Sequence, residues 1–158
     1  MRLVLLAALL IFQVGCEPSV NRYICVDLMS DKHTLDEVDG RGTVEANAAT
    51  ALETVDYIAT VRGFSRVAPD IEKATHFERK YRRDAHVPGE RGVSLMLNAQ
   101  RRSEHVVISL MFFRGKEESE LMRSVRLDLT SRLVEQFGEE NVSVAANERD
   151  LKLICADR

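Results

Sequence analysis

The sequence predicts an α+β domain, a two-layer sandwich in which a mainly antiparallel sheet carries two helices on one face. Two observations support this fold class. Apolar residues recur at helical spacing in two long stretches, and six shorter runs read as strands. The elements follow one another as βαβββαββ, and this pattern leaves the order of the strands in the sheet open.

The first strand is expected over residues 23–28 (YICVDL), followed by a polar loop at 29–43 that contains two glycines. A first helix is expected at 44–62. Thr43 can cap its start, and Gly63 stands where a left-handed C-terminal stop is expected. The apolar side of this helix consists of Val44, Ala48, Leu52, Val55, Ile58 and Ala59.

Three strands are expected next, at 74–82, 92–98 and 104–113, with a turn at 84–92 marked by Pro88 and Gly89. The last of the three has the strongest strand composition in the chain, with β-branched and aromatic residues throughout. Both of its faces are largely apolar, which predicts a central strand or a strand covered on both sides.

A second helix is expected at 117–137, with Asp128 and Arg132 as a surface ion pair and Gly138 at its end. Two short strands, at 142–146 and 151–155, complete the predicted domain. The buried stripe of the second helix consists of Leu121, Val125, Leu129, Leu133 and Phe137.

The N-terminus has the features of a secretory signal. Arg2 precedes ten apolar residues, 3–12, and small residues follow before Cys16. A transmembrane helix needs about 20 apolar residues, so this run is too short to span a bilayer.

Gly15 and Cys16 at the end of this signal resemble the lipobox of bacterial lipoproteins, although Gln13 replaces the usual leucine. The resemblance covers residues 1–17. It implies that Cys16 carries a diacylglycerol and that 1–15 are removed, leaving a tether at 16–21 and one domain at 22–158. Because Glu17 follows the cysteine instead of aspartate, the resemblance favours the periplasmic face of the outer membrane.

The amino-acid composition limits the classes of partner that we expect for this chain. Removal of 1–15 leaves 143 residues, enough for one domain, with 21 basic and 25 acidic side chains and a net charge of −4. This balance gives no electrostatic basis for binding nucleic acid. We expect membrane attachment through Cys16 and a protein partner in the cell envelope.

The three cysteines fit this location. If Cys16 is lipidated, Cys25 and Cys155 remain as an even pair near the two ends of the mature chain. In an oxidising periplasm they can form a disulfide. The alternative is a pair of buried thiols that act as small apolar side chains.

No motif predicts a catalytic residue, a cofactor or a metal. The four histidines, His33, His76, His86 and His105, lack metal-ligand spacing, although His76 and Glu78 would share one face of a strand. The acidic residues at 31–39 lack the alternation of an EF-hand loop.

The most unusual local composition is a basic hairpin, which could bind an anionic surface. The alternative is a solvated hairpin whose charges protect a sheet edge from aggregation. Its candidate binding residues are Arg79, Lys80, Tyr81, Arg82, Arg83 and Arg91.

These features together predict an envelope lipoprotein with a small non-enzymatic domain that binds another macromolecule, as assembly accessories, secretion-system components and immunity proteins do. The alternative is a small periplasmic enzyme or ligand carrier whose site has no local motif. Such a site would be a pocket in which polar groups converge.

Overall fold

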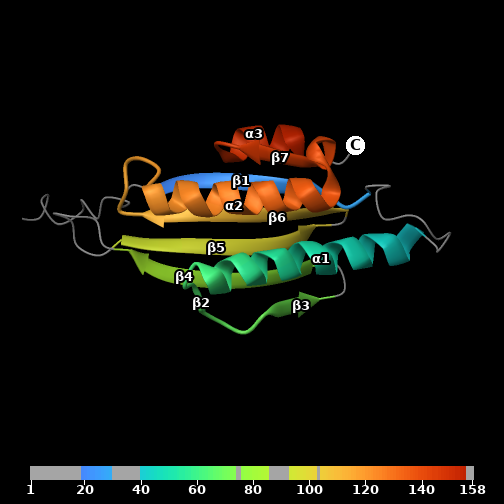
Figure 1. Cartoon of the computed structure of the whole chain (residues 1–158), viewed down its shortest axis with the longest axis horizontal. Coiled ribbons are helices and arrows are strands. Elements are labelled where there is room, and N and C mark those ends of the chain that lie inside the picture. Colours follow the sequence, from blue (N-terminus) through green and yellow to red (C-terminus); the bar gives the residue numbers. More distant parts are fainter. Residues whose placement is uncertain (1–18, 30–39, 74–75, 86–92, 103, 156–158) are drawn as a thin grey trace, which may run out of the picture.

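The computed structural model describes residues 19–29, 40–73, 76–85, 93–102 and 104–155. In this part of the chain, seven strands form one antiparallel sheet, and three α-helices lie against it (Figure 1). The predicted α+β class is therefore confirmed.

The strands are β1 (Ser19–Asp27), β2 (Ser65–Arg66), β3 (Ile71–Lys73), β4 (His76–Ala85), β5 (Val93–Arg102), β6 (His105–Phe113) and β7 (Val142–Ala145). The helices are α1 (Gly40–Val61), α2 (Glu120–Phe137) and α3 (Glu148–Ile154), with a short 3-10 turn at Glu139–Asn141. No helix in the described part of the chain is long and apolar enough to cross a membrane.

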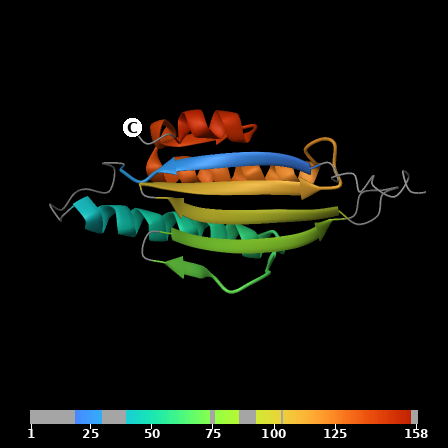
Figure 2. The same cartoon turned by 180° about the vertical axis from the view of Figure 1, so that it is seen from behind.

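The strand order is β2-β4-β5-β6-β1-β7, and β3 also pairs with β4. The first strand lies between β6 and β7, so Tyr23 stands opposite Ser109 on one side and Ala145 on the other. β6 is central, as its two apolar faces predicted. Figure 2 shows the sheet from the side that α1 and α2 do not cover.

The main core lies between one face of the sheet and the helices α1 and α2. Because side chains alternate along a strand, Leu95, Leu97, Ile108 and Leu110 all point to this face and are fully buried. The helix α2 adds a stripe at helical spacing, formed by Met122, Val125, Leu129, Leu133 and Phe137.

Two glycines end the long helices as predicted. Gly63 and Gly138 have φ angles of 72° and 94°, a region that side-chain-bearing residues rarely adopt. At the start of α2, the Ser119 side chain accepts a hydrogen bond from the Met122 backbone N–H at 3.1 Å. The predicted Thr43 cap is wrong, because α1 begins at Gly40 and already includes Thr43.

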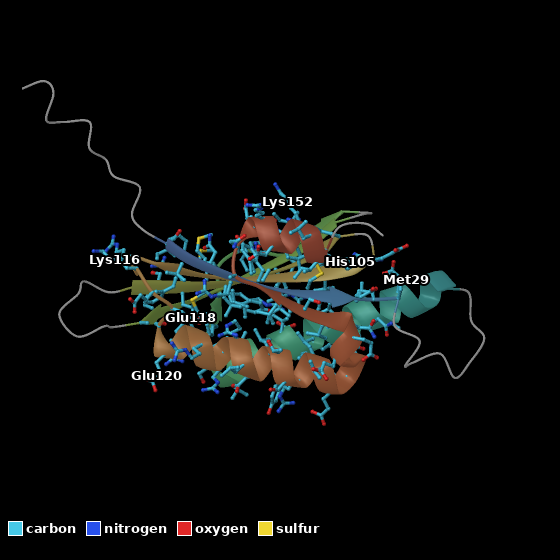
Figure 3. All side chains as sticks on the ribbon, turned by 90° about the horizontal axis from the view of Figure 1, so that it is seen from above. Met29, His105, Lys116, Glu118, Glu120 and Lys152 are labelled. Carbon is cyan, nitrogen blue, oxygen red and sulfur yellow. A yellow bond between two sulfur atoms is a disulfide. The ribbon has the colours of Figure 1, made fainter. Side chains whose placement is uncertain are left out.

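The predicted final strand is also wrong. Residues 151–155 belong to α3 and its C-terminal end, because the Asn147 side chain accepts the Asp150 backbone N–H at 2.9 Å and caps a helix there. In Figure 3, α3 lies on the opposite side of the sheet from α1 and α2. There it packs in a second apolar cluster that contains Tyr23, Cys25, Val107, Ala145 and Leu151.

Two smaller expectations also differ. Residues 19–21, expected in the tether, are the first residues of β1. Asp128 does not pair with Arg132: it accepts hydrogen bonds from Arg62, and the Arg132 guanidinium lies 4.4 Å from the centre of the Tyr57 ring. The partners of Asp128 and Arg132 are therefore set by tertiary contacts of α2 with α1 and the residue that follows it. Spacing within one helix cannot predict such contacts.

Candidate functional site

The basic residues of β4 are divided between the two faces of the sheet. Arg79, Tyr81 and Arg83 point to the α1 side, since they stand opposite Ala99, Leu97 and Leu95 of β5. Lys80 and Arg82 point to the other face. Arg91 lies outside the described residues.

On the α1 side, Arg79 and Tyr81 belong to an ionic network. The Tyr81 hydroxyl and Arg79 both donate to Asp56 of α1, and Arg79 also pairs with Asp70 at 2.8 Å. Burial, and then the hydrogen bond to Asp56, raise the pKa of Tyr81. The hydrogen bond from Arg79 lowers the pKa of Asp70. The network connects α1, the β2–β3 segment and β4.

The other described cations of the hairpin also form contacts within the domain. Lys80 pairs with Glu78 at 2.7 Å, Arg82 pairs with Asp84 at 3.0 Å, and Arg83 donates to the backbone carbonyl of Arg62. The described residues of the predicted patch therefore do not form a single cationic surface.

Two of the four histidines, His33 and His86, lie outside the described part of the chain. His76 and His105 stand on either side of Arg102 in the register of β4, β5 and β6. No group of three or more His, Cys, Asp or Glu residues among those described could hold a metal ion.

One candidate site is a cleft of about 590 Å³ between α3 and the sheet face that α1 and α2 leave uncovered, here called the α3 cleft. Its floor comes from β1, β5 and β6, and its wall from α3. Its volume lies within the usual range for ligand sites. The lining residues are Asn21, Tyr23, Gln100, Arg102, Val107, Ser109, Met111, Glu148, Leu151, Lys152 and Cys155.

The lining of the α3 cleft combines apolar surface with hydrogen-bonding groups. The Asn21 side-chain oxygen is buried and has no hydrogen-bond partner among the described residues, so it can accept from a ligand. Burial, and then the nearby Glu148 carboxylate, raise the pKa of Tyr23. The hydroxyl of Tyr23 is therefore neutral at physiological pH. The Asn21 amide and the Tyr23 hydroxyl suit hydrogen bonding to a ligand.

A second hollow of about 710 Å³ adjoins the α3 cleft, and both are lined by Asn21, Tyr23 and Glu148. It extends past the start of β1 to residues 116–118, and Figure 3 labels Lys116 and Glu118 at this end. Together the two hollows form an elongated depression.

An ion pair fixes the edge of the second hollow. Arg126 donates to Glu118 at 2.7 and 3.1 Å, and Arg22 lies 3.9 Å from the same carboxylate. The hydrogen bond from Arg126 lowers the pKa of Glu118. These contacts join the start of α2 to β1.

A disulfide between Cys25 and Cys155 attaches the wall of the α3 cleft to its floor. The two Cα atoms are 6.2 Å apart, within the range that a disulfide spans. Cys25 lies on β1, and Cys155 follows the last turn of α3, so the bond fixes the end of this helix to the sheet.

Sequence reasoning missed most of the α3 cleft. On β5 and β6, the side chains of its floor alternate with residues of the main core, and this alternation is the signal that the sequence offered. The wall was hidden because residues 151–155 have the alternation of a strand.

No model of a known protein family matches this sequence, and no curated protein matches it. The vertebrate conserved region of human METTL16, a solved structure, is similar with a TM-score of 0.35 and 7% identity, over 66% of this chain and 80% of that chain. Similarity at this level carries no argument about function.

Proposed function

We propose that this chain is a lipoprotein of the bacterial cell envelope, anchored by lipid on Cys16, whose non-enzymatic domain binds a partner protein in the α3 cleft. The lipobox resemblance at Gly15 and Cys16 supports the anchor. The Cys25–Cys155 disulfide supports export, because such bonds persist in oxidising compartments.

The observation that carries the binding role is the α3 cleft on the sheet face that α1 and α2 leave uncovered. It offers a buried acceptor on Asn21, which has no hydrogen-bond partner among the described residues, and apolar contacts from Val107 and Leu151. Interfaces that bind an extended segment combine such apolar contacts with hydrogen bonds to the segment's backbone.

The short distance between anchor and domain fits this proposal. Only residues 17 and 18 lie between the lipidated cysteine and Ser19, the first residue of β1. The three residue steps from 16 to 19 span at most about 10 Å, so the domain would stay beside the membrane and meet partners there.

Site-specific photo-crosslinking in intact envelopes tests the binding role. A photoreactive residue replaces Gln100 on the floor of the cleft, and the control places it at Leu127, which is exposed on α2. We expect one protein to crosslink from position 100 and not from position 127. An excess of soluble domain should reduce this crosslinking by competing for the partner.

Equal crosslinking from both positions would contradict the proposal. So would a small molecule, found by native mass spectrometry, that fills the cleft and blocks crosslinking, because that result indicates a ligand carrier.

A further inference from the structure

We infer that the α3 cleft binds a carboxylate of an extended acidic peptide segment, held by Arg102 and Lys152. This inference rests on the proposed function and specifies the chemistry of the partner. Its starting point is the distribution of cations over the described residues.

Eight of the described cations pair with a carboxylate. Arg22 and Arg126 share Glu118, Arg66 and Arg79 share Asp56 and Asp70, and Arg101 pairs with Glu45. Further pairs involve Arg62, Lys80 and Arg82.

Two further cations, Arg102 and Lys152, line the α3 cleft. Arg102 donates to the Gln100 side-chain oxygen at 2.9 Å, and neither it nor Lys152 forms an ion pair with any described residue. They come from β5 and α3, so floor and wall both contribute positive charge. A charge-assisted hydrogen bond from each to a carboxylate would satisfy both.

One acid also lines the cleft. Glu148 lies one helical turn before Lys152 on α3 and acts on Tyr23, whose pKa it helps to raise. It therefore lies towards Asn21 and Tyr23, whereas Arg102 and Gln100 lie on the far strand of the floor. With two cations and one acid, the lining carries a net charge of +1 in a protein of net charge −3.

The length of the floor fits a short extended segment. From Val107 to Met111, β6 covers about 14 Å at the rise of an antiparallel strand. This length matches about four extended peptide residues. The Asn21 oxygen can accept a backbone N–H of such a segment, and Val107, Met111 and Leu151 can contact its apolar side chains.

The test uses three five-residue peptides in an NMR titration of the oxidised domain. The first alternates glutamate with leucine and has both ends blocked. The second has glutamine in place of glutamate and a free terminal carboxylate. The third has glutamine and both ends blocked, so it carries no charge.

We expect the first or the second peptide to shift the amide signals of Gln100, Val107 and Leu151, and the third to leave them unchanged. The first arm identifies a side-chain carboxylate and the second a chain-terminal one. Binding should weaken with salt. The double variant Arg102→Glu with Lys152→Glu should lose at least about tenfold in affinity.

The matched control is Arg149→Glu, which reverses an exposed charge on the same helix without lining the cleft. It should bind as wild type does. If the double variant fails to fold, the salt dependence of wild-type binding and the neutral peptide decide alone. Binding of the neutral peptide as tight as that of the acidic ones would overturn the inference, as would the absence of binding by any peptide.

The two proposals can fail separately. Crosslinking of an envelope protein from position 100, together with no binding of either acidic peptide, would leave the proposed function in place and remove the carboxylate. Binding of an acidic peptide without any crosslinked protein would support the carboxylate site and contradict the proposed protein partner.

Discussion

Removal of the Cys25–Cys155 disulfide tests how the domain is held together. The bond joins residues 130 positions apart. On the chain-entropy model, opening a loop of this length costs about 5 kcal/mol of stability at 25 °C. For a domain of this size, 1 kcal/mol corresponds to a melting-temperature change of about 2–4 °C, so we expect a decrease of about 10–20 °C.

Thermal unfolding by circular dichroism, with and without a reducing agent, measures this effect. Wild type should lose stability on reduction, whereas Cys25→Ser and Cys155→Ser should be less stable than oxidised wild type and insensitive to the reagent. Cys25 is buried and Cys155 only half-buried, so agreement between the two variants would separate loss of the bond from loss of packing. If reduction left the wild-type melting temperature unchanged to within about 1 °C, the entropic reasoning would be refuted.

Three further predictions follow from the sequence and the contacts. Cys16→Ala should release the protein from membranes, and intact mass of the wild type should show loss of residues 1–15 and added acyl chains; a membrane-bound variant would contradict the anchor. Asp56→Ala should destabilise by about 1–3 kcal/mol in a denaturant titration, because Tyr81 and Arg79 lose a shared acceptor, whereas Asp84→Ala, at an exposed pair, should cost less than about 1 kcal/mol. The pKa of Glu118 is lower in the folded state than its usual 4.5. The ionised carboxylate therefore contributes its full stability above pH 4.5, and this contribution is lost as pH falls through the folded pKa. Glu118→Gln should flatten the pH dependence of the unfolding free energy in this acidic range.

The elements with a long, regular apolar pattern could be predicted from the sequence. The helix α2 and the strand β6 each present a repeating buried face, and the glycines at 63 and 138 mark two helix ends. The last element could not be assigned in this way. Residues 151–155 are short, and their alternation of apolar and polar side chains suits both a strand and one turn of a helix. The Asn147 cap and the sheet face beneath α3 determine the outcome.

The basic hairpin shows a different limit. Composition identified a dense group of cations, but period-2 alternation along β4 sends neighbouring side chains to opposite faces. The acids that pair with Arg79 lie on α1 and on the segment between β2 and β3. Such partners depend on the tertiary fold, so local charge density alone could not separate a binding surface from an internal network.

The disulfide and the α3 cleft depend on each other. With seven residues, α3 is too short to be stable as an isolated helix. Leu151 is its buried apolar contact with the sheet, and the bond from Cys155 to Cys25 holds its end. Since α3 also supplies Lys152 and Glu148, the wall of the cleft is positioned by the same covalent bond that stabilises the domain. Reduction should therefore loosen the wall of the cleft as well as lower the stability of the domain, which joins the proposed location of this protein to its proposed function.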